Sequence, residues 1–230
     1  MTTQSSAAQA LASVVTQHGT SSQAQWLAAA VQALGTPPQP MKLRIGLARA
    51  ARKLGHEPLE LSVAEREALP VGPGYGRWVL RDFGRASLLL TALERLAASE
   101  HLALVEPLIR RSDAGEQVSL LRAAPLLPEP ERFTAVVVDA CRTNSVEVFE
   151  AIACDNPFPR DFFSDGAYNQ IVIKAMFVDS GVDRIVGLAE RVNPEMVRMA
   201  ADYAAERRAA ARSIPPGVDT IHELAKAKPS

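Results

Sequence analysis

The chain has 230 residues, and its 25 basic and 26 acidic side chains leave a net charge of -1. This balance excludes a global basic field that would attract nucleic acid or an anionic membrane. A chain of this length buries about 70% of its extended surface on folding, which allows a sizeable hydrophobic core. Aromatic residues make up only 5% of the chain and alanine and leucine dominate, so the composition favours packed helices.

Cysteine usage and hydropathy indicate the compartment. Cys141 and Cys154 have neither CxxC spacing nor the density of a secreted disulfide scaffold, and we interpret them as small buried hydrophobic residues. The sequence contains no run of 18 apolar residues, and its N-terminus lacks the basic region and apolar stretch of a secretory signal. We therefore expect a cytoplasmic protein with no membrane-spanning helix.

Residues 1–69 predict helices separated by short breaks. Residues 1–41 contain no Asp, Glu, Lys or Arg, yet apolar residues recur at helical spacing on both sides of Gly19. The segment PVGPGYG, residues 70–76, predicts a linker before a long helix. Its GxGxG pattern follows no predicted strand and precedes no Gly-Lys-Ser/Thr, so a phosphate-binding loop is not indicated.

The later part of the chain contains an internal similarity. Residues 133–145 align without gaps to residues 168–180, and residues 146–157 align to 182–194 with one added residue, so that both units end in Asn-Pro. Two predicted helices per unit and this spacing are typical of an α-solenoid in the HEAT and TPR size range. An all-α bundle without a repeat is the alternative.

We therefore predict an all-α single domain, residues 1–230, built as an antiparallel helix-pair solenoid. After the N-terminal helices and the linker, residues 77–212 form stacked helix pairs. The repeat units lie at about 130–157 and 165–194, and residues 213–230 form a tail.

The segment DNPFPRDFFSDGAYNQ, residues 155–170, is expected to contain the loop between the two repeat units. Loops of a solenoid gather on one edge, where function often lies. Phe158, Phe162 and Phe163 either seal the groove between repeats or line a pocket. Sealing is the simpler interpretation, because aromatic rings bury a large area.

Polar side chains on an otherwise apolar helix mark a candidate binding surface. Asn169, Gln170 and Lys174 lie in the predicted helix YNQIVIKAMF, where Gln170 and Lys174 share a face. Such groups pair within the protein or point into a wet cavity, and both possibilities stay open. On the last predicted helix Asp202 pairs with an arginine one turn earlier. Arg207 belongs to a group of arginines that either complements the helix dipole or binds an anionic metabolite.

No catalytic motif is present. The sequence lacks GxSxG and HExxH, and its histidines are dispersed. Asp155, Asp161 and Asp165 lack the DxDxDG spacing of a calcium loop, so neither a metal site nor a cofactor is predicted. Acid–base chemistry by Asp161 or Asp165 with Arg160 stays open as an alternative.

Two stretches together, DNPFPRDFFSDGAYNQIVIKAMF and NPEMVRMAADYAAERRAAAR, resemble the EboA family of metabolite-traffic proteins encoded in bacterial ebo clusters. The matching positions are Asn156, Pro157, Asn169, Gln170, Lys174, Asp202, Tyr203, Glu206 and Arg207. Tyr168 departs from the family pattern, in which Phe is more frequent. The resemblance covers residues 130–212 well and the N-terminal half only in helical character.

The resemblance implies a cytoplasmic protein encoded beside a membrane prenyltransferase, a cyclase similar to dehydroquinate synthase, and barrel-fold relatives. It implies a role in making or moving a small metabolite, with the enzymes of the ebo cluster as partners. It transfers no catalytic residue.

We hypothesise a non-enzymatic helical-repeat protein that binds a small metabolite or pathway enzymes. The alternatives are a cryptic enzyme acting on a cyclitol or prenylated intermediate and a general HEAT-like adaptor. The candidate binding residues are Asn156, Phe158, Arg160, Phe162, Asn169, Gln170, Lys174, Asp202, Tyr203 and Arg207.

Overall fold

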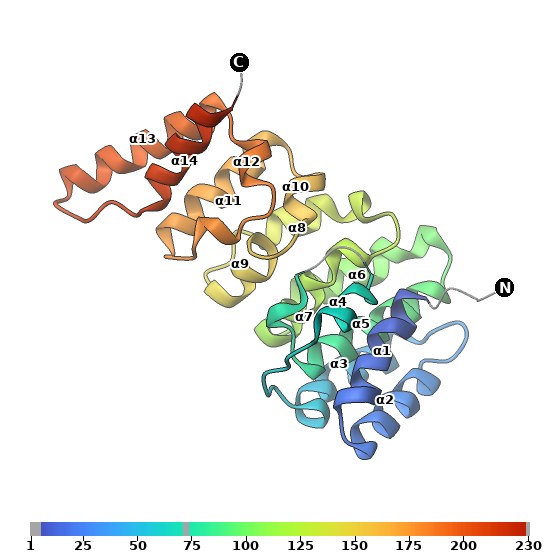
Figure 1. The fold of residues 1–230 in the computed structure, drawn as a ribbon. Helices are drawn as coiled ribbons and strands as arrows, with labels where there is room; N and C mark the ends of the chain where they lie inside the picture. The colour runs from blue at the N-terminus through green and yellow to red at the C-terminus, as the bar shows by residue number, and fades with distance from the viewer. Residues whose placement is uncertain (1–5, 71–73, 229–230) are drawn as a thin grey trace. The chain divides into compact units, whose positions relative to one another are not determined.

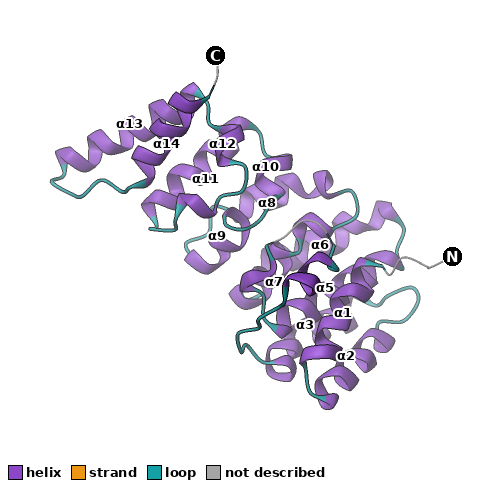
Figure 2. Cartoon of the chain, viewed as in Figure 1, coloured by secondary structure: helices purple, strands orange, loops and turns teal. Residues whose placement is uncertain are grey.

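The computed structural model describes residues 6–70 and 74–228, and helices joined by loops make up these ranges (Figure 1). No β-strand occurs in the described part of the chain, which holds one isolated bridge between Pro58 and Val79 (Figure 2). The predicted all-α class is therefore confirmed. Residues 71–73 of the predicted linker and the first five residues of the uncharged stretch lie outside the described residues.

The chain divides into two compact units, residues 1–140 and 141–230, and each is described by itself. The helices of the N-terminal unit are α1 (Ala7–His18), α2 (Ser21–Ala33), α3 (Pro40–Leu54), α4 (Val63–Glu67), α5 (Leu80–Glu94), α6 (His101–Arg111), α7 (Ala114–Arg122) and α8 (Thr134–Ala140). Short 3-10 turns join them at η1 (Tyr75–Arg77), η2 (Ala98–Glu100), η3 (Ala124–Leu126) and η4 (Pro130–Phe133).

Local sequence sets the ends of the first helices. α1, α2 and α4 begin with capping boxes, in which Ser6, Thr20 and Ser62 accept a backbone N–H while the residue three positions later bonds back. Gly19 ends α1 and separates it from α2, as the helical spacing predicts.

Helix α5 is the centre of the N-terminal unit. It is buried along most of its length and packs against α1, α3 and α7, so it has no polar face turned to solvent. Gly84 permits this packing, because a Cβ at this position would collide with Leu54 of α3. The predicted long helix after the linker is confirmed, and its start is marked by the buried indole of Trp78.

A buried ionic network ties α5 to its neighbours. Arg85, 1% exposed, donates from Nε to the Leu47 carbonyl at 3.0 Å and from Nη1 to Ser119 Oγ at 3.1 Å. Asp82, also 1% exposed, accepts from Ser119 Oγ and from Arg122 Nη1, both at 2.6 Å. Because each buried charge has a partner, the network is structural and fixes α3, α5 and α7 together.

The helices of the C-terminal unit are α9 (Val146–Ala153), α10 (Phe158–Phe162), α11 (Asp165–Phe177), α12 (Leu188–Arg191), α13 (Pro194–Ala209) and α14 (Gly217–Ala227), with a 3-10 turn at η5 (Val182–Arg184). α13 packs against both α11 and α14. α14 occupies most of the region that the sequence predicts to be a tail, and it contributes the buried side chains of Val218 and Ile221 to this unit.

The two predicted repeat units differ in structure. The first contains α8 and α9, whereas residues 181–193 of the second form η5 and the four-residue α12 in place of one helix. Gly187 explains the break, because it has a φ of +81°, and a side chain there would collide with Arg160. The aligned position in the first unit is Ala151, within α9. Stacking of such units into a solenoid stays a prediction.

Candidate functional site

The aromatic segment of residues 155–170 contains a short helix and its flanking turns where the sequence predicts a loop, and its last six residues begin α11. Its helix is α10, and the ring of Phe158 is fully buried. The centroid of that ring lies 4.9 Å from the Phe162 ring and 6.1 Å from the Phe163 ring. The aromatic side chains therefore pack with one another and seal the interior of the C-terminal unit.

The Asn156 side chain fixes the turn that leads into α10. Its Nδ2 donates to the Ala151 carbonyl at 2.8 Å, and its Oδ1 accepts from the Phe158 backbone N–H at 3.0 Å. Asn156 is 3% exposed, so these bonds satisfy an amide that water does not reach. Asn156 therefore stabilises the backbone conformation of this turn.

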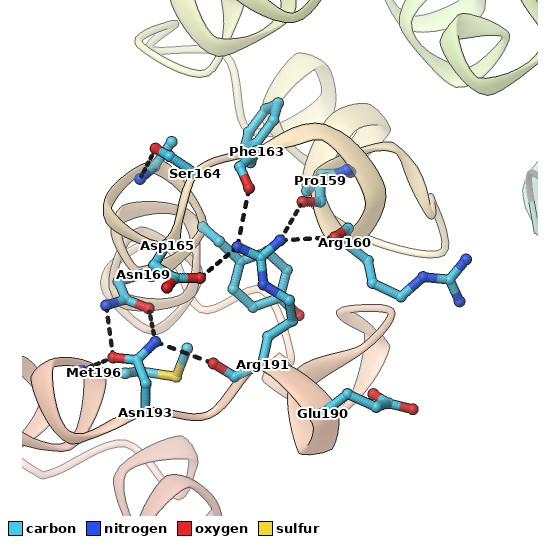
Figure 3. Close-up of polar contacts among 12 residues, drawn as sticks. Pro159, Arg160, Phe163, Ser164, Asp165, Asn169, Glu190, Arg191, Asn193 and Met196 are labelled. Atoms are coloured by element: carbon cyan, nitrogen blue, oxygen red, sulfur yellow. Dashed lines mark hydrogen bonds and ion pairs between the residues drawn. The ribbon is translucent and has the colours of Figure 1, made fainter. Parts of the chain in front are cut away.

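The Arg191 side chain closes the far side of the same segment (Figure 3). Its guanidinium donates to the carbonyl oxygens of Pro159 at 3.3 Å, Arg160 at 2.7 Å and Phe163 at 2.9 Å. It also donates to the Asp165 carboxylate at 2.7 Å. One planar fork thus satisfies three carbonyl oxygens at the end of α10 and an acidic residue at the start of α11.

Two further polar residues of α11 are bonded within the protein. Tyr168 is fully buried and donates from its hydroxyl to the Val186 carbonyl at 2.9 Å, and burial raises its pKa. Asn169 and Asn193 exchange two side-chain hydrogen bonds, visible in Figure 3. Asn193 Oδ1 also accepts from the Met196 N–H at 2.9 Å and so caps α13.

The carboxylates considered for acid–base chemistry are held in ion pairs. Asp161 accepts two hydrogen bonds from Arg160, at 2.6 and 3.1 Å, and Asp165 is bonded to Arg191. No group of three or more His, Cys, Asp or Glu side chains within the described ranges is arranged to hold a metal ion.

A groove with a volume of about 550 Å³ lies between α11 and α13 in the C-terminal unit. We call it the α11–α13 groove. Its α11 wall consists of Gln170, Ile173, Lys174 and Phe177, which follow one another at i, i+3, i+4 and i+7. Its α13 wall consists of Tyr203, Glu206, Arg207 and Ala210, which have the same spacing, and Arg212 lies just beyond. Each wall is therefore one stripe of a helix.

Lys174 joins the groove to the protein interior. Its Nζ donates to the carbonyl oxygens of Cys141 at 2.6 Å and Thr143 at 2.7 Å, and it lies 4.9 Å from the centre of the Phe149 ring. Two of the three ammonium protons are thereby used. Burial raises the pKa of the neighbouring Cys141 thiol to about 12, so this cysteine is not a nucleophile at neutral pH.

The groove carries a surplus of positive charge. Arg207 uses its Nε for the Ser213 carbonyl at 2.8 Å, which leaves its terminal nitrogens for other partners. The exposed Arg212 side chain makes no hydrogen bond or ion pair within the described ranges. Together with Lys174 these residues place three cations on the groove, against the carboxylate of Glu206.

Two aromatic residues give the groove its apolar surface. Phe177, at the end of α11, is 71% exposed. Tyr203 lies with its ring centre 6.0 Å from the Arg207 guanidinium carbon. The Tyr203 hydroxyl is buried and has no hydrogen-bond partner among the described residues, which is energetically unfavourable.

The structure separates the residues that the sequence marks as candidates. Gln170, Lys174, Tyr203 and Arg207 meet on the α11–α13 groove. Asn156, Phe158, Arg160, Phe162 and Asn169 do not line it. Asp202 lies on the exposed face of α13, where it pairs with Arg198 at 2.6 Å.

Sequence reasoning gave no role to Ile173 and Phe177 of the groove and named Glu206 only as a position that matches the family, whereas Arg212 belongs to the group of arginines for which binding of an anionic metabolite was one interpretation. The stripes at i, i+3, i+4 and i+7 that contain the first three of them were visible in the sequence, but nothing in the sequence showed that the two stripes face each other.

Comparison with known families adds an observation on the whole chain. Residues 7–222 match the family described as metabolite traffic protein EboA, and this span includes both walls of the groove. The chain belongs to the EboA family. No curated protein and no solved structure matches it significantly. Within the residues that the structure describes, no helix of this EboA-family protein combines the length and apolarity needed to cross a membrane.

Proposed function

We propose that this EboA-family protein acts in metabolite traffic by binding a small molecule in the α11–α13 groove and releasing it unchanged. The ligand has an apolar body and one anionic group. The observation that carries this proposal is that cationic side chains with unused donors and exposed aromatic surface occur together on one groove. The family description supports a small-molecule cargo.

The apolar surface of the groove favours a ligand with a hydrophobic body. Phe177 is 71% exposed, which is unusual for a large aromatic residue, and Ile173 lies one turn before it. A ligand that covers this surface gains about 25 cal/mol for each Å² of apolar area removed from water. The volume of about 550 Å³ lies within the range of small-molecule sites.

The cations of the groove favour an anionic group on that ligand. Arg212 has its whole guanidinium free within the described ranges, and Arg207 has both terminal nitrogens free. A guanidinium binds a carboxylate or phosphate through two parallel hydrogen bonds, which gives both affinity and orientation. Gln170 adds an amide on the opposite wall.

Binding without turnover is favoured over a cryptic enzyme. The residues considered for catalysis, Asp161 and Asp165 with Arg160, do not line the groove, and both carboxylates are ion-paired. No observation on the groove favours a particular bond-making or bond-breaking step.

The proposal is tested with the full chain and the low-molecular-mass fraction of its source cells. The protein is incubated with this fraction and desalted, and the retained ligand is weighed by native mass spectrometry. We expect the wild type to retain a ligand. Phe177→Ala and Arg212→Ala are expected to retain about tenfold less of it. Arg208→Ala is the matched control, because Arg208 is an exposed arginine on α13 that does not line the groove.

Lys174→Ala is a poor probe of binding, because the variant also removes two hydrogen bonds to backbone carbonyls. Equal retention by wild type, Phe177→Ala and Arg212→Ala would place the ligand elsewhere and contradict the proposal. A retained molecule whose mass changes during incubation would show turnover and would support the enzyme alternative.

A further inference from the structure

The N-terminal unit contains a groove of its own. It has a volume of about 760 Å³ and lies between the start of α3 and helix α6. We call it the proline groove, because Pro37, Pro38 and Pro40 line one side of it and Pro107 lines the other. Its size lies within the range of small-molecule sites, about 300 to 1,000 Å³.

The walls of the proline groove are apolar and conformationally restricted. Proline has a fixed φ and little side-chain freedom. A ligand that packs on these prolines therefore costs the protein little conformational entropy. Leu104 and Leu108 of α6 complete the apolar surface. Met41, a large apolar side chain that lines the same groove, is 65% exposed.

The charged side chains on the proline groove favour a ligand of a particular charge. Arg44 and Arg111 line it, and neither makes an ion pair or a side-chain hydrogen bond among the described residues. Arg110, the residue before Arg111, differs in this respect, because it is paired with both Glu106 and Asp139.

One carboxylate, that of Glu100, also lines the proline groove. The Glu100 carboxylate accepts a hydrogen bond from the backbone N–H of Ala97 at 3.4 Å, so part of its hydrogen-bonding capacity is used within the same turn. The groove therefore offers two unpaired guanidinium groups beside an apolar surface.

We propose that the proline groove is a second small-molecule site, for a ligand with an apolar body and one carboxylate or phosphate group. Charge complementarity to Arg44 and Arg111 fixes the anionic end, and the prolines with Met41 and Leu104 take the apolar end. This site is independent of the α11–α13 groove, because all of its residues belong to the N-terminal unit.

The test uses the full chain and three probes with the same ten-carbon body: decanoate, decanamide and decylamine. Binding is measured by calorimetry and by the methyl NMR signal of Met41. We expect decanoate to bind about tenfold more tightly than decanamide, and decylamine most weakly, because only the head group differs. Arg44→Ala combined with Arg111→Ala is expected to reduce the affinity for decanoate to that for decanamide.

Three control variants locate the binding of the probes on the chain. Arg49→Ala removes an exposed arginine of α3 that does not line the groove, and it should leave decanoate binding unchanged. Ala103→Trp fills the groove at an exposed position and should abolish the Met41 response to decanoate and decanamide. Arg212→Ala, in the α11–α13 groove, should leave that response unaltered.

The proposal is overturned if decanoate binds no more tightly than decanamide or if Ala103→Trp leaves the Met41 response intact. It is also overturned if decanoate produces no Met41 response at all. The test of the α11–α13 groove is separate, because it measures a ligand retained from the source cells and not the response of Met41 to these probes.

Discussion

Asn169 and Asn193 exchange two side-chain hydrogen bonds, with Nδ2 to Oδ1 distances of 3.1 and 3.0 Å. Asn169 is 1% exposed, so the pair replaces the water that each amide would otherwise bind. The pair also fixes the orientation of Asn193, whose Oδ1 caps α13. This contact therefore supports the N-cap of the helix that carries one wall of the α11–α13 groove.

Replacing Asn169 with Leu is expected to lower the free energy of unfolding by about 1 to 3 kcal/mol, because the partly buried Asn193 amide loses one hydrogen-bond donor and one acceptor. Urea denaturation measures this difference. Gln170→Leu, at the exposed neighbouring position, should change stability by no more than about 0.5 kcal/mol. Equal losses in the two variants would show that the amide pair does not stabilise the fold.

Arg191→Lys keeps the charge but loses the planar fork. A lysine cannot bond the carbonyls of Pro159, Arg160 and Phe163 together, so we expect a loss of about 2 to 3 kcal/mol. Hydrogen exchange of amides in residues 158–165 should accelerate in this variant. The matched control is Arg198→Lys in an exposed ion pair, where the change should stay below about 1 kcal/mol. Unchanged exchange in residues 158–165 would contradict the role of Arg191.

Removing the hydroxyl group is expected to affect stability differently at Tyr168 and at Tyr203. Tyr168 donates to the Val186 carbonyl, whereas the buried Tyr203 hydroxyl has no partner among the described residues. Tyr168→Phe should therefore lower stability by about 1 kcal/mol, and Tyr203→Phe should leave it unchanged or raise it. Thermal unfolding of the two variants measures this. Destabilisation by Tyr203→Phe equal to that by Tyr168→Phe would show that the Tyr203 hydroxyl is bonded.

The Glu65 carboxylate is expected to stabilise the N-terminal unit, and this stabilisation should be lost at low pH. Hydrogen bonds from the Ser62 side chain and backbone, and a contact with His18, lower its pKa from 4.5 to about 2. The folded-state pKa lies below the unfolded one, so the unfolded chain binds more protons between these values. The stabilisation is present above pH 4.5 and is lost as the pH falls towards 2.

The urea midpoints of wild type and Glu65→Gln should therefore differ most at pH 6 and converge as the pH falls towards 2. Glu67→Gln, on the same short helix, makes a suitable control, because the Glu67 side chain has no hydrogen bond among the described residues. A difference between wild type and Glu65→Gln that is constant with pH would exclude the proposed origin.

The helices were predictable because their signals are local. The apolar stripe of α11 and the start of α13 after an Asn-Pro pair follow from spacing and capping alone. The α10 helix was missed because its five residues, one of which is Pro159, carry too little periodicity. The break at Gly187 was missed because its alignment with Ala151 suggested a helix, whereas Gly187 has a left-handed φ and lies too close to Arg160 to carry a side chain.

The candidate site was predictable only in part, for a different reason. Asn169 and Lys174 look alike in the sequence, as polar residues on an apolar helix. Their partners, Asn193 and the Cys141 and Thr143 carbonyls, lie 24 to 33 positions away in the chain. Arg191 gave no signal at all, since its role depends on carbonyl oxygens that every residue possesses.

Helix α11 contains two sets of residues with different roles, which alternate along the helix. Tyr168, Ile171, Val172, Ala175 and Met176 are buried, whereas Gln170, Ile173, Lys174 and Phe177 line the groove. Of the latter, only Lys174 also holds distant backbone. The three remaining positions can therefore change while the buried set stays intact, and under the proposed function such changes would alter ligand preference without a compensating change in the scaffold.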